Sequence, residues 1–585
     1  MRRSKVWLSG LALSSLIITI SSPLQPSLAG DGKSTENFSF QFNAETSFAP
    51  QISVPPQNDN YGAYLVLPPC VAQVKNDCIS SVEYTNTKGE WIKGKFKELI
   101  PLKNVEWSDK DFRSDYNDLD QPVFAKARPA QNYPAGGRTG IWDLSGAPHA
   151  AGTTYAVTLG FPGAASNTVN PRAEGSVVSW YAQGGFTLKL FPIVYDINAP
   201  LYTDKDSKGN LIGGAGSCSG GFGSASRYRC VASEIQPFPR QTKFRITANF
   251  KATKTMLDKV DWYFGRVINA GIKESKGPDG SISVSFEGSP TLVGSVMTEF
   301  AKNQENYEVV KRAYDTYWQL TWGQEQNIFK TYEDFAKYGG AGLSTRDPGT
   351  SAAWQILEEK FDFNYLFEEE TWQVSTSRIS LDDLKLISNC GEADIVPGII
   401  STNAVAANPS PPKWNPETKE LTYSIASPHT RKDGALNVGV YELSIDKRLA
   451  ECLWGKDSLQ YRAAISVTTA DGTQKVATTL FADNDKVLSF RATGFSYSTS
   501  LIRVKLNKDG GSEASKKALP DLFLDTGVKP KPLSWTVSTP KTKTSTTKPT
   551  PAKSPLKTIT CTKGKISKKV TASNPKCPSG LKRIN

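Results

Sequence analysis

Strict alternation of apolar and polar residues is the feature that most restricts how this chain can fold. The segment TKFRITANF (242–250) carries an apolar residue at every second position. Further alternating segments are 155–161, 186–193 and 281–288. Period two with Thr, Val, Phe and Tyr is typical of half-buried strands, and Gly- and Pro-rich stretches between them indicate loops. We therefore predict an N-terminal β-rich domain over 30–250.

The alternation returns in shorter runs towards the C-terminus. These runs are ELTYSIASP (420–428), RAAISVTTADGTQKVATTLF (462–481) and SLIRVKL (500–506). Asp471-Gly472 falls near the middle of the second run and predicts a hairpin there. Short strands with turns between them favour an Ig-like β-sandwich over 386–508.

A different periodicity occupies part of the region between these two. Residues 303–320 place aromatic and aliphatic side chains at three- and four-residue spacings, which predicts an amphipathic helix. Shorter helices are predicted at 331–340, which has a Thr-x-x-Asp start, and at 350–361. We expect 251–385 to be a mixed region of strands with a helical insert, in a protein that is mainly β.

The first 29 residues read as a secretory signal peptide. Arg2, Arg3 and Lys5 precede an apolar stretch over 6–20, and Ser27-Leu28-Ala29 is a small-x-small cleavage site. The stretch is short for a membrane span, and whether it is cleaved or retained as an anchor stays open. No later segment approaches a membrane span, so we expect a secreted or envelope-associated chain with no transmembrane span in its mature form.

Eight cysteines fit such a location, because disulfides form in an oxidising exterior. Proximity in sequence suggests four pairs, while other connectivities stay open: Cys70/Cys78, Cys218/Cys230, Cys390/Cys452 and Cys561/Cys577. No CxxC motif occurs, which disfavours zinc. We expect no metal and no cofactor.

The net charge of +12 belongs to the C-terminal tail. Residues 529–585 hold fourteen Lys or Arg and no Asp or Glu, whereas 30–528 hold 52 basic and 57 acidic residues. A nucleic-acid partner is therefore not expected for the body. Residues 509–557 read as a Thr/Pro/Lys-rich disordered linker, and 558–585 as a small basic hairpin that needs a disulfide staple.

Such a tail is expected to bind anionic envelope polymers such as teichoic acids or acidic polysaccharides. The candidate contacts are Lys563, Lys565, Lys568, Lys569, Lys576, Lys582 and Arg583. A tail that serves only solubility is the alternative.

The two histidines lie in similar contexts. His149 and His429 each follow a proline and precede a glycine and a tyrosine-bearing alternating run. We predict that each hydrogen-bonds a loop backbone, and that the shared context marks a duplicated sandwich unit. They lie about 280 residues apart, so they could form a metal pair only if the two domains met there.

Catalytic motifs are missing from the sequence. There is no G-x-S-x-G, H-E-x-x-H or G-x-x-x-x-G-K-[ST]. Glycan hydrolysis by two carboxylates stays open, because Glu358, Glu359 and Glu368–Glu370 lie near Trp354 and Trp372. The favoured interpretation of these acids is a solvated helix face and a charged turn. Candidates for stacking on a ligand are Trp142, Trp180, Trp262 and Trp414.

Several segments resemble secreted proteins of aquatic actinobacteria that have no established activity. The C-terminal TITCTKGKISKKVTASNPKCPSG resembles a short module of such proteins. Two longer segments, SPPKWNPETKELTYSIASPHTRKDGALNVGVYELSIDKRLAECLWG and ISVTTADGTQKVATTLF, resemble a domain of their large extracellular proteins, and DWYFGRVINAGI is typical of the group. The resemblance covers about 250–585 and implies an exported surface protein, with no site residues to carry over.

These observations favour an exported, non-catalytic cell-surface or cell-wall protein that binds a glycan or protein ligand and is tethered by its cationic tail. A secreted glycan-active hydrolase and a purely structural envelope component are the alternatives.

Overall fold

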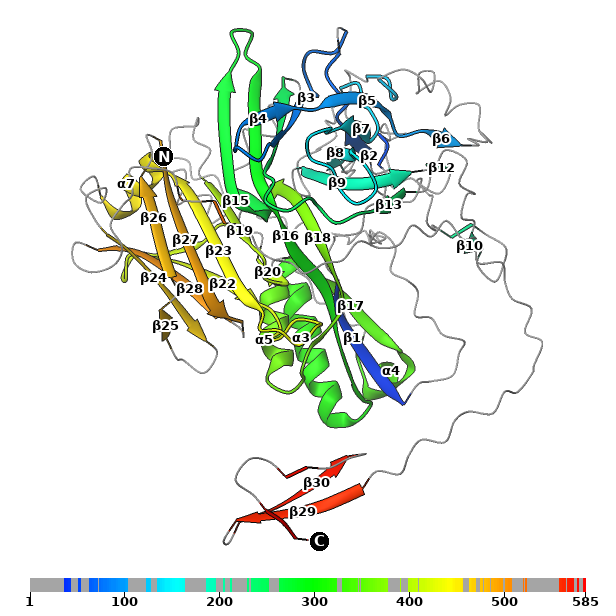
Figure 1. Cartoon of the computed structure of the whole chain (residues 1–585), viewed down its shortest axis with the longest axis vertical. Helices are drawn as coiled ribbons and strands as arrows, with labels where there is room; N and C mark the ends of the chain where they lie inside the picture. Colours follow the sequence, from blue (N-terminus) through cyan, green and yellow to red (C-terminus); the bar gives the residue numbers. More distant parts are fainter. Residues whose placement is uncertain are drawn as a thin grey trace, which may run out of the picture. The chain divides into compact units, whose positions relative to one another are not determined.

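Three long strands form the centre of the fold in this computed structural model: β15 (Tyr263–Lys276), β16 (Ile282–Ala301) and β18 (Asn364–Thr376) (Figure 1). Each of them changes partner along its length. The first half of β16 pairs with β14 and β15, and its second half pairs with β1 and β18. The first half of β15 pairs with β18 and β19 instead. Several sheets therefore share these strands and diverge from one crossing.

The structure describes only part of the chain. The described residues are 36–43, 51–53, 63–71, 73–103, 123–127, 134–163, 186–195, 204–205, 211–212, 229–230, 233–251, 262–322, 329–345, 347, 349–376, 390, 398–408, 410–455, 462–469, 474–476, 478–483, 486–497, 500–507, 519, 521–522, 557–563, 566–572, 576–577 and 582–584. The predicted signal peptide and most of the predicted linker lie outside them.

Two sheets enclose the first core. One has the order β4-β3-β14-β16-β15, with β3 (Cys78–Thr85), β4 (Trp91–Lys93) and β14 (Phe244–Phe250). The other runs β5-β7-β8-β9 and continues into β18. Its strands are β5 (Lys95–Leu99), β7 (Gly140–Asp143), β8 (Thr154–Gly163) and β9 (Thr187–Tyr195), with β2 (Ala63–Val66) and β13 (Ser233–Ile235) at its margins. Apolar side chains from both sheets form one buried cluster.

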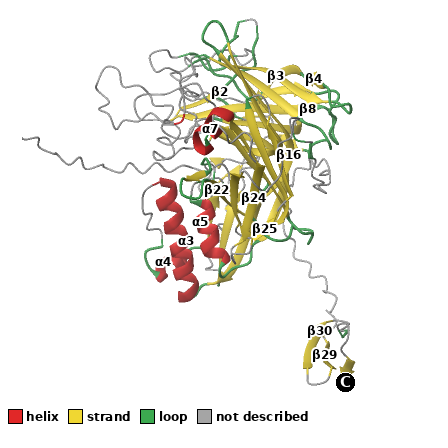
Figure 2. Ribbon diagram, turned by 90° about the vertical axis from the view of Figure 1, so that its left-hand side faces the viewer, coloured by secondary structure: helices red, strands yellow, loops and turns green. Residues whose placement is uncertain are grey.

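Helices cover a second part of the sheet system. β17 (Gly340–Ser344) pairs with β1 (Asn37–Asn43), which pairs with β16. Three helices lie together here (Figure 2): α3 (Gln304–Trp322), α4 (Tyr332–Lys337) and α5 (Thr350–Glu358). Their apolar residues share a buried cluster with those of β1. Thr331 caps α4 by accepting a hydrogen bond from the Asp334 N–H.

The C-terminal part of the body is a β-sandwich, as predicted. One layer continues from β15 through β19 (Gly398–Thr402), β23 (Val438–Asp446) and β27 (Val487–Ser496) to β26 (Thr478–Asp483). The other contains β20 (Ala406–Ala407), β21 (Lys413–Asn415), β22 (Glu420–Ala426), β28 (Ser500–Asn507), β24 (Arg462–Thr469) and β25 (Gln474–Val476). Their facing side chains form a third buried cluster.

Two local predictions need correction. The predicted hairpin at 462–481 contains the pair β24–β25, but β26 leaves this sheet and pairs with β27 in the opposite layer. Helix α7 (Lys447–Trp454) was not predicted, although Asp446 caps it and Gly455 ends it. An Asp before a helix and a Gly after it are recognisable helix boundaries in a sequence. Two further short strand pairs are β6 (Leu102–Lys103) with β12 (Arg229–Cys230), and β10 (Asp204–Lys205) with β11 (Leu211–Ile212).

The chain divides into two compact units, Met1–Leu533 and Ser534–Asn585. Hydrogen bonds cross the expected boundary at residue 250, because β14 pairs with β16. They also join the mixed region to the sandwich, because β15 pairs with β19. Among the described residues, no helix is long and apolar enough to cross a membrane.

The close contact of β16 with β18 can be tested at Gly294. A Cβ at this position would overlap the carbonyl oxygen of Phe367. We expect Gly294→Ala to lower the free energy of unfolding by about 1–3 kcal/mol, because the two strands must move apart. Gly339→Ala is the control, since its Cβ would meet nothing within 4 Å. Urea unfolding that gave equal stabilities for the two variants would contradict this account.

Candidate functional site

The second unit is a small, disulfide-linked basic sheet. β29 (Lys557–Lys563) lies between β30 (Ile566–Ala572) and β31 (Lys582–Ile584). Cys561 is bonded to Cys577, and the side chains of Ile559 and Cys561 are buried. The predicted stapled hairpin is confirmed, with a third strand added. A unit of this small size depends on such a cross-link.

The cations of this unit reach solvent wherever their side chains are described. Lys569, Lys576, Lys582 and Arg583 are all exposed. The backbone of Lys563 and Lys568 lies in β29 and β30, whereas Lys565 lies outside the described residues. Because 529–585 contain no Asp or Glu, no acidic side chain of this segment neutralises them. The arrangement favours attraction of a polyanion.

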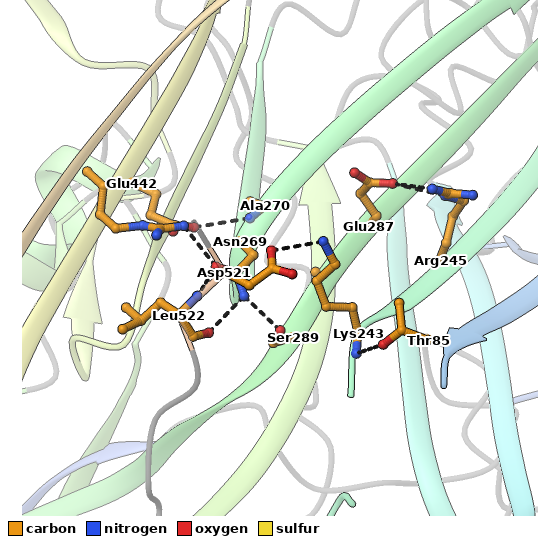
Figure 3. Close-up of polar contacts among 12 residues, drawn as sticks. Thr85, Lys243, Arg245, Asn269, Ala270, Glu287, Ser289, Glu442, Asp521 and Leu522 are labelled. Atoms are coloured by element: carbon orange, nitrogen blue, oxygen red, sulfur yellow. Dashed lines mark hydrogen bonds and ion pairs between the residues drawn. The ribbon is translucent and has the colours of Figure 1, made fainter. Parts of the chain in front are cut away.

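A partly buried polar junction joins the strand exchange to the end of the body (Figure 3). Asn269 lies at an irregularity in the β15–β16 pairing and has a positive φ of 60°, which Asn tolerates better than most residues. Its Nδ2 donates to Ser289 Oγ and to the Leu522 carbonyl oxygen, each at 2.8 Å. Its Oδ1 accepts from the Leu522 N–H at 2.7 Å and from Arg491 Nη2 at 2.8 Å. All four hydrogen-bonding positions of the amide are filled.

A buried ion pair supports this amide. Arg491 Nε lies 2.6 Å from Glu442 Oε1, and the two side chains are 5% and 7% exposed. The Ala270 N–H donates to the other carboxylate oxygen at 3.1 Å. Burial raises the pKa of Glu442, while Arg491 and the Ala270 N–H oppose this by favouring the charged form. The pair thus connects β15, β23 and β27.

The segment at Asp521 and Leu522 lies beyond the sandwich and is held on this junction. Besides the two backbone hydrogen bonds to Asn269, Asp521 forms an ion pair with Lys243 at 3.0 Å. Lys243 also lies 5.7 Å from the ring centre of Trp91. The exposed ion pair adds little stability, so the Asn269 hydrogen bonds carry most of this attachment. The chain is thereby fixed to the body shortly before the second unit begins.

A groove of about 490 Å³ lies where β16 ends and β18 begins. It is lined by Met297, Thr298, Glu299, Lys360, Phe361, Asp362, Asn364, Tyr365 and Leu366. Its polar side chains could hydrogen-bond a polyhydroxylated or peptide ligand. The hydroxyl of Tyr365 contacts Asn437 at 3.0 Å and Ser427 at 3.1 Å, which holds this wall of the groove in place.

The predicted carboxylates are held by other groups. Glu358 ends α5, and Glu359 pairs with Arg312 at 3.2 Å on the surface. Glu368–Glu370 lie within β18, so the expected charged turn is a strand. Glu368 lies 3.7 Å from Arg431, and Glu370 accepts a hydrogen bond from the Phe238 N–H at 2.6 Å. Burial raises the pKa of Glu368, while Arg431 opposes this. Trp354 and Trp372 are completely buried, so neither ring can stack on a sugar.

The candidate stacking tryptophans are placed differently from one another. Trp142 and Trp262 are 4% and 2% exposed, and the Trp142 ring packs edge-on against Phe96. Burial leaves neither ring open to a ligand, because both lie in hydrophobic cores. Trp414 is half-buried and packs against Trp454. Trp180 lies outside the described residues.

The histidines occupy unrelated positions, so the predicted duplication is wrong. His149 lies in the turn of the β7–β8 hairpin, within one sheet. His429 lies between β22 and β23, which belong to opposite layers of the sandwich. Similar local sequence does not determine which sheet the next strand joins.

The predicted role of His149 is confirmed: its Nε2–H donates to the Thr154 carbonyl oxygen at 3.0 Å, and Nδ1 accepts from the Ala151 N–H. His429 is exposed.

Three predicted disulfides are confirmed. They are Cys70–Cys78, Cys390–Cys452 and Cys561–Cys577. Cys230 lies in β12, whereas Cys218 lies outside the described residues. In the part of the chain that the structure describes, no three His, Cys, Asp or Glu residues are grouped as a metal site requires.

No protein-family model matches this chain, and no curated protein matches it either.

His149 predicts a pH dependence of stability. Burial lowers its pKa below the ordinary value of 6.5, and the hydrogen bond to Thr154 only partly opposes this. Just below pH 6.5 the unfolded chain therefore binds more protons than the folded chain, so stability falls as the pH decreases. Between pH 7.5 and pH 5, we expect the thermal unfolding midpoint of His149→Gln to depend less on pH than that of the wild type. The exposed His429→Gln serves as control, and an unchanged slope in His149→Gln would contradict this role.

The buried ion pair predicts a second, larger effect. Arg491→Met leaves the Glu442 carboxylate buried without its counter-charge, which should cost about 3–5 kcal/mol of unfolding free energy. Replacing both partners, as Glu442→Leu with Arg491→Met, should recover much of this loss. Arg503→Met is the control: its side chain is 31% exposed and lies 3.9 Å from Glu420, so we expect about 0–1 kcal/mol. Urea unfolding measures all three, and equal losses for Arg491→Met and Arg503→Met would refute the assignment.

Proposed function

We propose that this protein is an exported, non-catalytic binding protein of the cell surface, attached to the envelope by its cationic C-terminal unit. The observation that carries the proposal is that unit itself. Exposed Lys569, Lys576, Lys582 and Arg583 lie on a disulfide-linked sheet in a segment without acidic residues. Long-range attraction to anionic polymers needs no specific pocket, because uncompensated charge of one sign is sufficient.

Further features of the body support an extracellular role. Cys70–Cys78 and Cys390–Cys452 are cross-links of the kind that persist outside the cytosol, and the sequence begins with the pattern of a signal peptide. The resemblance to exported proteins of aquatic actinobacteria agrees with this. The groove at the β16–β18 junction is our candidate site for a glycan or protein ligand on the body.

Glycan hydrolysis is the weaker alternative. Three of the five acids considered for it are engaged by other groups: Glu359 by Arg312, Glu368 by Arg431 and Glu370 by the Phe238 N–H. The neighbouring Trp354 and Trp372 are buried in the cores, where they stabilise the fold. A purely structural role differs from our proposal only in lacking a ligand for the groove. A glycan-array hit for a chain that ends at Leu533, which lacks the cationic unit, would favour a groove ligand over a purely structural role.

The tether is tested by comparing the full chain with a chain that ends at Leu533, where the first unit ends. Both are incubated with bacterial cell walls that retain their anionic polymers and are sedimented. We expect the full chain to sediment with the walls and the shortened chain to stay in solution. Raising the salt from about 0.1 M to about 1 M shortens the Debye length from ~10 Å to ~3 Å and should release the full chain.

Equal thermal midpoints for the major transition of both chains would show that the first unit is intact. Sedimentation of the shortened chain to the same extent as the full chain would refute the tether.

A further inference from the structure

The two faces of the C-terminal sheet are not equivalent. Along β29, Ile559 and Cys561 point to one face and are buried, and Cys561 is bonded there to Cys577. Thr560 and Thr562 alternate with them and point to the opposite face, where they are half-buried. The face that carries Ile559 and Cys561 is therefore buried, and the opposite face, which we call the open face, is more accessible to solvent.

Strand register places two cations on the open face. Lys569 of β30 lies directly opposite Thr560, and Lys582 of β31 lies directly opposite Thr562. Directly opposed residues in antiparallel strands point to the same face. Both lysines are exposed. The open face thus carries two threonine hydroxyls with a lysine on either side of them.

Arg583 belongs to the other face, because it lies opposite the buried Cys561. Lys576 precedes Cys577 in the connection between β30 and β31 and lies in neither strand. Among the side chains described in this unit, the exposed cations thus form two pairs that are equal in charge and different in placement.

The spacing on the open face suits a chain of anions better than a single small one. Adjacent strands lie about 4.8 Å apart, so β30 and β31, on either side of β29, are separated by about 10 Å. The two lysine positions are also displaced along the sheet by two residues, which is about 7 Å. Successive charges of an extended polymer could meet both ammonium groups, while the threonine hydroxyls could donate hydrogen bonds between them.

We propose that Thr560, Thr562, Lys569 and Lys582 form the binding surface for a linear polyanion, a polymer with repeating phosphodiester or carboxylate groups. This inference rests on the proposed tether function and assigns it to one face of one sheet. The remaining cations contribute only to the general attraction.

The test compares two double variants of the full chain that lose the same charge. Lys569→Gln with Lys582→Gln removes the cations of the open face, and Lys576→Gln with Arg583→Gln removes the other exposed pair. The probes are poly(glycerol phosphate) and polygalacturonate, each immobilised, with binding measured at low salt. We expect the first pair to weaken binding by about tenfold or more and the second pair by about twofold. Lys569→Arg with Lys582→Arg should bind like wild type.

A clearly larger loss of binding for the open-face pair than for the other pair supports the proposal, and the polymer that shows it identifies the source of the anions. Equal losses for the two pairs would overturn it and leave the tether in place as an effect of net charge. If the wild-type chain binds neither polymer nor cell walls, the tether itself fails. Mass-spectrometric detection of the Cys561–Cys577 disulfide in every variant confirms that the sheet is intact.

Discussion

The side-chain amide of Asn269 is the contact on which the arrangement of the body depends. It lies where β15 changes partner, and its hydrogen bonds reach Ser289 of β16, Arg491 of β27 and the backbone of Leu522. The left-handed backbone conformation of Asn269, at the irregularity in the β15–β16 pairing, lets β15 leave one sheet and enter another. Since no position of the amide is left unfilled, the strand exchange, the sandwich and the end of the body are fixed at one point.

This junction explains why the body forms one compact unit in spite of its separate hydrophobic clusters. Strand β15 supplies Val267 to the first hydrophobic cluster and Phe264 to the cluster of the sandwich. Arg266, between them, donates to the carbonyl oxygens of Thr402 and Val405 in the sandwich. Unfolding of one core would therefore leave the Arg266 guanidinium, or the carbonyl oxygens that it contacts, without a hydrogen-bond partner in the adjacent core. Such a loss is costly for a buried group, so the stabilities of the two cores are coupled.

The two units divide the proposed function according to their physical properties. The first has extensive cores and no excess of positive charge, since residues 30–528 hold 52 basic and 57 acidic residues, and it is suited to holding a ligand groove in a fixed shape. The second has little to bury and a high density of positive charge, and is suited to salt-dependent attraction without a pocket. Because Leu522 is hydrogen-bonded to Asn269, a pulling force on the proposed C-terminal tether would reach the body at this junction.

The sequence by itself predicted many of the strands, the helices α3, α4 and α5, three disulfides between near neighbours and the separation of charge. These depend on residue periodicity, short spacings and composition. Which sheet each strand joins was decided only by the tertiary structure, because alternation at His149 and at His429 is similar while their strands pair differently. The same holds for the Asn269 junction and the open face of the C-terminal sheet. Both arise from residues far apart in the chain or from strand register, and no local pattern encodes either of them.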